Sequence, residues 1–162
     1  TYVGGTWRQS PAATDLGTVS TKDAADYLLG LTATDRGGVG RDAIFPVTIA
    51  DSVKPWPQLF RIARDDSRPS ATRKQALFWL GQAAGKVVDP DRSDREHVSD
   101  EDEVKKSAVF AISQRRKDEA VPALIQVART NRSPDVRRTA LFWLGQTTDP
   151  RAISLFEEIL TH

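Results

Sequence analysis

Three phenylalanines recur at intervals of 32 residues and are the first candidates for a functional surface. Phe78, Phe110 and Phe142 each have a cationic side chain four residues earlier and a glutamine four residues later. The cations and amides are Lys74, Lys106, Arg138, Gln82, Gln114 and Gln146. Rings bury apolar area and polar neighbours orient a bound chain, so the pattern predicts a groove for a peptide or protein segment. The alternative is that each ring packs in the core between neighbouring helices.

Few residues offer catalytic or metal-binding chemistry. The 162 residues include no Cys and two His, which excludes thiol nucleophiles and Cys-type metal sites. No Gly-rich phosphate loop or Gly-x-Ser-x-Gly motif is present. Residues 89–100 resemble a calcium loop only faintly, because Asp94 stands where that loop needs Gly, and His97 lacks further ligands. We therefore expect no enzymatic activity, no metal and no cofactor.

The net charge of +1 hides two segments of opposite sign. Residues 89–103 hold eight acids and two bases, whereas residues 115–138 hold seven bases and three acids. A basic stretch can meet phosphate, but it is more often a solvated surface, so we expect no specific nucleic-acid partner. No apolar run reaches the ~18 residues of a membrane-spanning helix. The expected partner is another protein or a peptide, and the expected oligomeric state is a monomer.

An internal repeat must position the three phenylalanines. The heptapeptide Ala-Leu-Phe-Trp-Leu-Gly-Gln occurs at 76–82 and again at 140–146, and a diverged copy lies halfway between them at 108–114. Such an identity at twice a regular period is hard to obtain by chance, so a repeat of about 32 residues is predicted.

Each copy is expected to be a helix that alternates with another helix. Apolar residues recur at helical spacing in five of the predicted elements. Pro46 would bend or shorten the helix expected over 40–51. The predicted buried stripes are Ala24, Tyr27, Leu28 and Leu31; Trp56, Leu59, Phe60 and Ala63; Val121, Leu124, Ile125 and Ala128; Val136, Ala140, Trp143 and Leu144; and Ile153, Phe156, Ile159 and Leu160. Trp79 and Trp143 are expected to pack in the core.

The sequence resembles the HEAT-repeat family, particularly its bacterial form related to the HEAT-like repeats of phycobilin lyases. The resemblance is carried by residues 136–141 (VRRTAL), by Leu144-Gly145 and by residues 149–152 (DPRA), although Trp143 replaces a usually small residue. It covers roughly residues 50–162 well and 20–50 less well. The resemblance implies an armadillo-like α-solenoid whose second helices form the concave surface, where Phe142 would lie. It also implies structural roles for Arg73, Lys105 and Arg137, and it does not imply lyase activity.

The expected architecture is all-α: an extended segment over 1–19 and a repeat domain over 20–162. Helix pairs are expected at about 20–51, 54–82, 86–114 and 119–147, with a final helix at 150–161. The first helix of the third pair is degenerate, because residues 83–102 keep hardly any apolar stripe. We expect this segment to be a hinge or a surface that a partner covers.

These observations favour a non-enzymatic protein-interaction or scaffold module that binds a peptide or protein on its concave face. Two alternatives stay open. The chain could be a structural segment of a larger array with no binding site of its own, or a chromophore-handling protein. Because Thr1 is not a translation start, we expect sequence upstream of it. An exported bacterial protein is the expected location, with the cytoplasm as the alternative.

Overall fold

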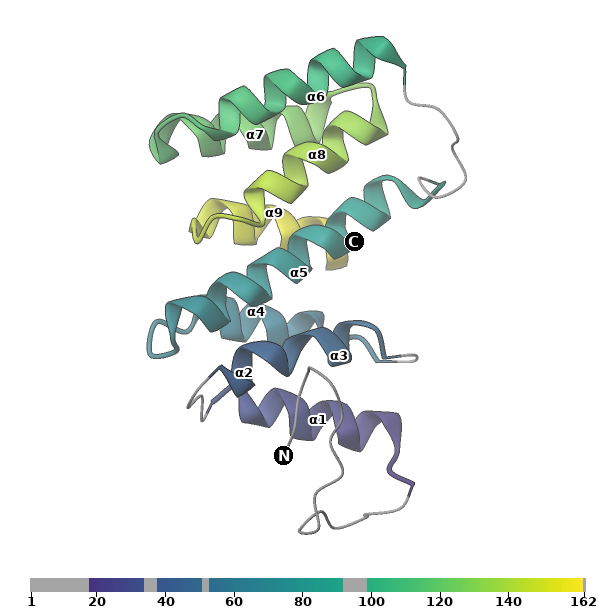
Figure 1. The fold of residues 1–162 in the computed structure, drawn as a ribbon, viewed down its shortest axis with the longest axis vertical. Coiled ribbons are helices and arrows are strands. Elements are labelled where there is room, and N and C mark those ends of the chain that lie inside the picture. Colours follow the sequence, from purple (N-terminus) through teal and green to yellow (C-terminus); the bar gives the residue numbers. More distant parts are fainter. Residues whose placement is uncertain (1–17, 34–37, 51–52, 92–98, 162) are drawn as a thin grey trace. The chain divides into compact units, whose positions relative to one another are not determined.

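The computed structural model describes residues 18–33, 38–50, 53–91 and 99–161 (Figure 1). The helices are α1 (Thr21–Leu31), α2 (Val39–Asp42), α3 (Ile44–Thr48), α4 (Trp56–Arg64), α5 (Ser70–Val88), α6 (Asp100–Ser113), α7 (Lys117–Thr130), α8 (Pro134–Leu144) and α9 (Pro150–Thr161). These described residues contain no strand, so the predicted all-α repeat fold is confirmed. The chain divides into two compact units, Thr1–Ala76 and Leu77–His162.

In the first unit, α1 buries a different face from the predicted one. Ala25, Leu29 and Thr32 are buried, whereas Tyr27 keeps 54% of its surface exposed, so the predicted stripe was wrong by about one residue. The buried face ends in a polar side chain. The Thr32 hydroxyl donates to the Leu29 carbonyl at 2.6 Å and accepts from the Arg68 guanidinium at 2.5 Å. These bonds satisfy the buried hydroxyl and are compatible only with Thr32 facing Arg68.

The helix expected over 40–51 is divided into α2 and α3 around Ala43. Pro46 lacks an N–H and its ring would clash with the carbonyl four residues earlier, at Asp42, so one continuous helix is disfavoured. Gly38 precedes α2 with a φ of 87°, a left-handed conformation that side chains rarely adopt. Ala43, Ile44 and Val47 are fully buried.

The second unit contains the Leu77–Val88 part of α5 together with α6 to α9. Helix α7 packs against both α6 and α8, and its buried residues include Val121, Leu124 and Ala128. Helix α8 begins at a Ser133 cap and buries Val136, Ala140, Leu141 and Leu144. Helix α5 continues to Val88, past the expected end at Gln82, because no Gly-Pro or turn signal interrupts residues 83–88. Part of the degenerate helix, residues 92–98, lies outside the described residues.

The two identical heptapeptides cross each other within this unit. A Cβ atom placed on Gly81 would lie 3.0 Å from the Leu141 carbonyl oxygen, and one on Gly145 would lie 3.2 Å from the Leu77 carbonyl oxygen. Gly145 and Leu141 are the repeat counterparts of Gly81 and Leu77, so the contacts are reciprocal, as in an interface with two-fold symmetry. Continuing the series, Gly85 meets Arg138, which shows that α5 and α8 run antiparallel.

Helix α8 therefore lies between α6 and the Leu77–Val88 part of α5, although α6 precedes it in the chain (Figure 1). Helices α6 and α8 run parallel, since Lys106 contacts Asp135 and Phe110 contacts Trp143. The Gly81 surface of α5 also meets Phe156 of α9, 3.3 Å from the position of a Cβ atom. Helix α9 thus covers the Gly81 surface of α5 with an apolar side chain.

Candidate functional site

Five aromatic rings form a continuous row across α5, α8 and α6. The ring centroids are 5.0 Å apart for Trp79 and Phe78, and 6.3 Å apart for Phe78 and Phe142. They are 5.1 Å apart for Phe142 and Trp143, and 5.3 Å apart for Trp143 and Phe110. The first three pairs are edge-to-face and the pair of Trp143 and Phe110 is tilted at 49°, and edge-to-face pairs at these separations are favourable. We call these five residues the aromatic row.

The row is partly open to solvent. Phe110 is 49% exposed and Phe142 is 37% exposed, whereas Phe78, Trp79 and Trp143 are half-buried. Neither Phe110 nor Phe142 is therefore a core residue. The expectation that Trp79 and Trp143 pack in the core was only half right, because both indoles are half-buried and Trp143 lies against the exposed rings of Phe110 and Phe142.

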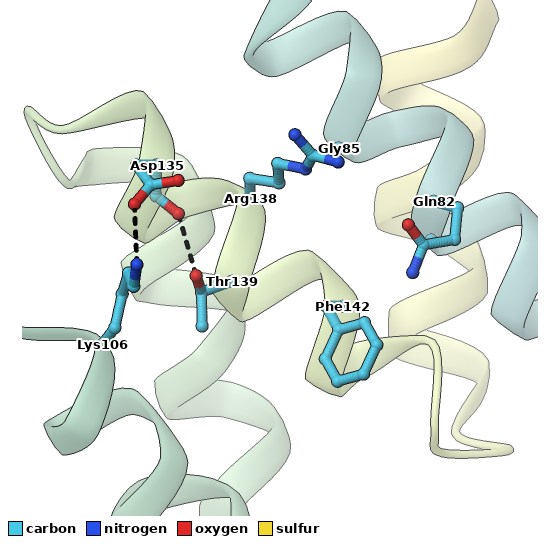
Figure 2. A pocket seen from close by; sticks show the side chains of 8 residues that line it. Gln82, Gly85, Lys106, Asp135, Arg138, Thr139 and Phe142 are labelled. Atoms are coloured by element: carbon cyan, nitrogen blue, oxygen red, sulfur yellow. Dashed lines mark hydrogen bonds and ion pairs between the residues drawn. The ribbon is translucent and has the colours of Figure 1, made fainter. Parts of the chain in front are cut away.

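A cavity of about 330 Å³ adjoins the row where α5, α6 and α8 meet (Figure 2). Four of the predicted site residues line it together with four residues that were not predicted. The lining residues are Gln82, Lys106, Arg138 and Phe142, and then Gly81, Gly85, Asp135 and Thr139. We call this cavity the pocket.

Two charged groups of the pocket neutralise each other. Lys106 Nζ lies 3.1 Å from Asp135 Oδ2 and 2.6 Å from Glu103 Oε1. Hydrogen bonding to Glu103, and then to Asp135, raises the pKa of Lys106 and keeps it charged. Asp135 is buried, and its backbone carbonyl accepts a hydrogen bond from the Thr139 hydroxyl at 2.9 Å. Figure 2 shows the contact of Lys106 with Asp135 and the hydrogen bond of Thr139 to Asp135.

Arg138 extends in the opposite direction from this pair. Its side chain crosses Gly85 of α5, and its Cγ atom would lie 3.1 Å from a Cβ atom at that position (Figure 2). Within the described ranges, no hydrogen bond or ion pair joins the Arg138 side chain to another residue. Gln82, one turn before Gly85, presents its amide to the same pocket. The pocket thus carries an accessible cation and an amide beside a partly exposed ring.

The other predicted site residues lie outside the pocket. Phe78 and Phe110 belong to the aromatic row, whereas Gln114 and Gln146 are exposed where α6 and α8 end. The Gln114 amide donates to the Ser113 hydroxyl at 3.1 Å. Lys74 is exposed on the part of α5 that belongs to the first unit. The repeat therefore brings together only part of the predicted set.

Sequence reasoning missed Gly81, Gly85, Asp135 and Thr139. The pocket arises because α5 approaches α8 antiparallel, whereas stacking in chain order would place α6 beside α5. A signal was present in the spacing of Gly81 and Gly85. Two glycines four residues apart lie on the same face of a helix and permit another backbone to come close.

The three cations expected to be structural, Arg73, Lys105 and Arg137, contact carboxylates or a backbone carbonyl. The Arg137 guanidinium donates to the Ala128 carbonyl oxygen at 2.9 Å, which joins α8 to α7. Arg73 pairs with Asp66, and Lys105 Nζ lies 2.6 Å from Glu101 Oε1. Arg73, Lys105 and Arg137 therefore do not line the pocket, whose two cations are Lys106 and Arg138.

Asp149 has a structural role at the start of α9. Its carboxylate accepts hydrogen bonds from the Arg151 backbone N–H at 2.9 Å and from the Arg151 guanidinium at 3.0 and 2.9 Å. These bonds, foremost those of the guanidinium, lower the pKa of the buried Asp149. The charged carboxylate thereby fixes the turn between α8 and α9.

The described residues were compared with the requirements of a metal site and of a membrane-spanning helix. Among those residues, no group of three or more potential ligands is placed to hold a metal ion. The faint calcium loop includes Asp94, and neither that residue nor His97 is among them. Within the same ranges, no helix has the length and apolar character needed to cross a bilayer.

Comparison with known proteins gives one match. Residues 95–162 match the family model for HEAT repeats, and this range includes α6, α7, α8 and α9. No curated protein and no solved structure matches the chain. The match thus covers the helices that carry Lys106, Phe110, Arg138 and Phe142.

Proposed function

We propose, from the match of residues 95–162 to the HEAT-repeat family model, that the chain is a non-enzymatic interaction module that binds an extended segment of a partner protein. Repeats of this family are commonly protein-interaction or scaffold modules. The proposed surface consists of the aromatic row and the adjoining pocket. It keeps six of the nine residues expected from the repeat alone and leaves out Lys74, Gln114 and Gln146.

One observation supports this proposal above the others: rings that could be core residues are exposed beside a cavity. Interfaces concentrate their binding energy in aromatic and arginine side chains surrounded by residues that exclude water. Phe110 and Phe142 retain 49% and 37% of their surface, and the half-buried Trp143 supports both rings from behind. A row of rings held in place in this way needs little ordering when a ligand binds.

The exposed aromatic area is large enough to matter for affinity. A phenylalanine, tyrosine or tryptophan buries roughly 150–250 Å² when covered. The exposed fractions of Phe110 and Phe142 therefore leave on the order of 130–215 Å² to cover. At about 25 cal/mol/Å², this area gives about 3–5 kcal/mol before the costs of association. Such a surface suits micromolar recognition of a peptide when polar contacts add to it.

The test uses peptides selected from a random display library on the wild-type protein. The variant Phe110→Ser/Phe142→Ser removes both exposed rings, and Val104→Ser is the matched control. Val104 is an apolar residue on α6, the helix that carries Phe110. It is 70% exposed and lies outside the aromatic row and the pocket. We expect the double variant to lose at least about tenfold in affinity for the selected peptides, and the control to bind as the wild type does.

Thermal unfolding of the same variants completes this test. The proposal predicts a change in melting temperature of only a few degrees for the double variant, because the two rings are partly exposed. It is refuted if the selected peptides bind the double variant with wild-type affinity. It is also refuted if the double variant unfolds at the assay temperature while Val104→Ser stays folded, because Phe110 and Phe142 would then be core residues. A chain that serves only as a structural segment of a larger array gives no selected peptides at all.

A further inference from the structure

We infer that the pocket binds a carboxylate of the partner, so that the partner segment is acidic and places an Asp or Glu side chain between Arg138 and Gln82. This inference rests on the proposed function and names the chemistry of the ligand. It follows from the distribution of charge around the pocket and from the direction of the Arg138 side chain.

The first step is the pairing of charges. Lys106 and Asp135 form an ion pair at 3.1 Å, and Glu103 adds a second carboxylate to Lys106 at 2.6 Å. Arg138 has no carboxylate partner among the residues that the structure describes. The residues that line the pocket therefore leave one positive charge, and this charge belongs to Arg138.

The second step is the direction in which Arg138 points. Arg138 lies three residues after Asp135 on α8, a spacing at which an ion pair within the helix is possible. The Asp135 carboxylate is instead turned to Lys106, and Arg138 extends to the other side of α8, toward α5 (Figure 2). Gly85 makes room for this conformation, because a Cβ atom there would lie 3.1 Å from Arg138 Cγ.

The third step is the match to a ligand. A guanidinium presents a planar pair of donors that suits a carboxylate, and the Gln82 amide N–H₂ adds a donor from α5. A single carboxylate balances the one unpaired charge. The geometry therefore points to a carboxylate ligand.

The neighbouring residues define the rest of the segment. Phe142 both lines the pocket and belongs to the aromatic row, so a residue adjacent to the bound carboxylate would reach that ring. Beyond Phe142 the row continues over Trp143 to Phe110 on α6. The predicted ligand is an extended segment in which an acidic residue lies next to apolar residues.

The test compares selected peptides with their amide counterparts. Peptides selected on the wild-type protein are synthesised with each Asp or Glu changed to Asn or Gln, and their dissociation constants are measured by calorimetry. Because an amide oxygen accepts weaker hydrogen bonds from the Arg138 guanidinium than a charged carboxylate does, we expect at least about tenfold weaker binding for one such amide peptide. Equal affinity of every acidic peptide and its amide counterpart would overturn the inference.

Variants of the protein then locate the effect. Arg138→Gln is expected to abolish the preference for the acidic peptide, whereas Arg138→Lys, which keeps the charge, is expected to retain part of it. The control Arg116→Gln removes the same charge from a side chain that is 81% exposed and pairs with Asp118 on the surface. If Arg116→Gln reduces the preference as much as Arg138→Gln does, the effect is general electrostatics and the site assignment is wrong.

Two further outcomes are informative. Tighter binding of a peptide with phosphoserine at the acidic position would refute the assignment of a single carboxylate. If the selected peptides depend on Phe110 and Phe142 but show no acidic preference, the proposed function stands and only the carboxylate site fails. The peptide comparison needs no altered protein, so it decides the inference even if Arg138→Gln unfolds.

Discussion

Replacing Gly81 by alanine tests the antiparallel crossing of α5 and α8. Alanine in place of glycine within a helix normally stabilises it by roughly 0.5–1 kcal/mol. At Gly81 the new methyl group would lie 3.0 Å from the Leu141 carbonyl oxygen and 3.1 Å from Gly145 Cα. Both are backbone atoms, so α5 and α8 would have to move apart.

The structure sets the expected magnitude of this change. Overpacking of a tight contact costs typically about 1–3 kcal/mol, which outweighs the gain in helix propensity. We therefore expect Gly81→Ala to lower the free energy of unfolding by about 1 kcal/mol. The control Gly30→Ala in α1 has no atom within 4 Å of the added methyl group. It should raise the free energy of unfolding by about 0.4–1 kcal/mol.

Urea unfolding followed by circular dichroism measures both variants. The reciprocal variant Gly145→Ala, whose methyl group would lie 3.2 Å from the Leu77 carbonyl oxygen, should be destabilised to a similar extent. The double variant should cost less than the sum of the two single variants, because helices that have already separated accept the second methyl group more easily. The reasoning is refuted if Gly81→Ala stabilises the protein as much as Gly30→Ala does.

Two further predictions concern the contacts that hold the repeat together. The lowered pKa of Asp149 stabilises the fold above the ordinary aspartate pKa of 3.8, and this stability is lost as pH falls from there through the folded value. The stability difference between the wild type and Asp149→Asn should therefore shrink below about pH 4, as measured by urea unfolding at a series of pH values. Arg137→Ala removes the hydrogen bond to the Ala128 carbonyl and should cost about 1 kcal/mol in thermal unfolding, with peptide affinity unchanged. Equal loss of peptide affinity would show that Arg137 also contributes to the binding surface.

The sequence was most informative where one apolar stripe dominates a helix. In α4, Leu59, Phe60 and Ala63 are buried as predicted, and in α9 so are Ile153 and Phe156. The prediction failed in α1, whose adjacent leucines allow more than one buried face. There the buried face includes Thr32, whose hydroxyl accepts a hydrogen bond from Arg68, 36 residues away. Periodicity alone contains no information about such a contact.

The residues of the candidate site were also predicted only in part from the sequence. The repeat period identified Phe110, Phe142, Lys106 and Arg138, which lie in one region on α6 and α8. It could not predict which cation would stay without a carboxylate, because that depends on Asp135 turning toward Lys106. It also could not predict the approach of α5, because the segment after Val88 breaks the pattern and α9 covers the Gly81 surface.

The reciprocal crossing of the identical heptapeptides has a consequence for pairing within one chain and between two chains. Residues 76–82 pack against their own duplicate, so the same surface would fit that duplicate in a second molecule. Only the covalent connection between α5 and α8 favours pairing within one chain, because it holds the two copies at a high effective concentration. Fidelity of folding therefore depends on tethering as well as on complementarity. Refolding at high protein concentration is the condition in which two chains would exchange these helices.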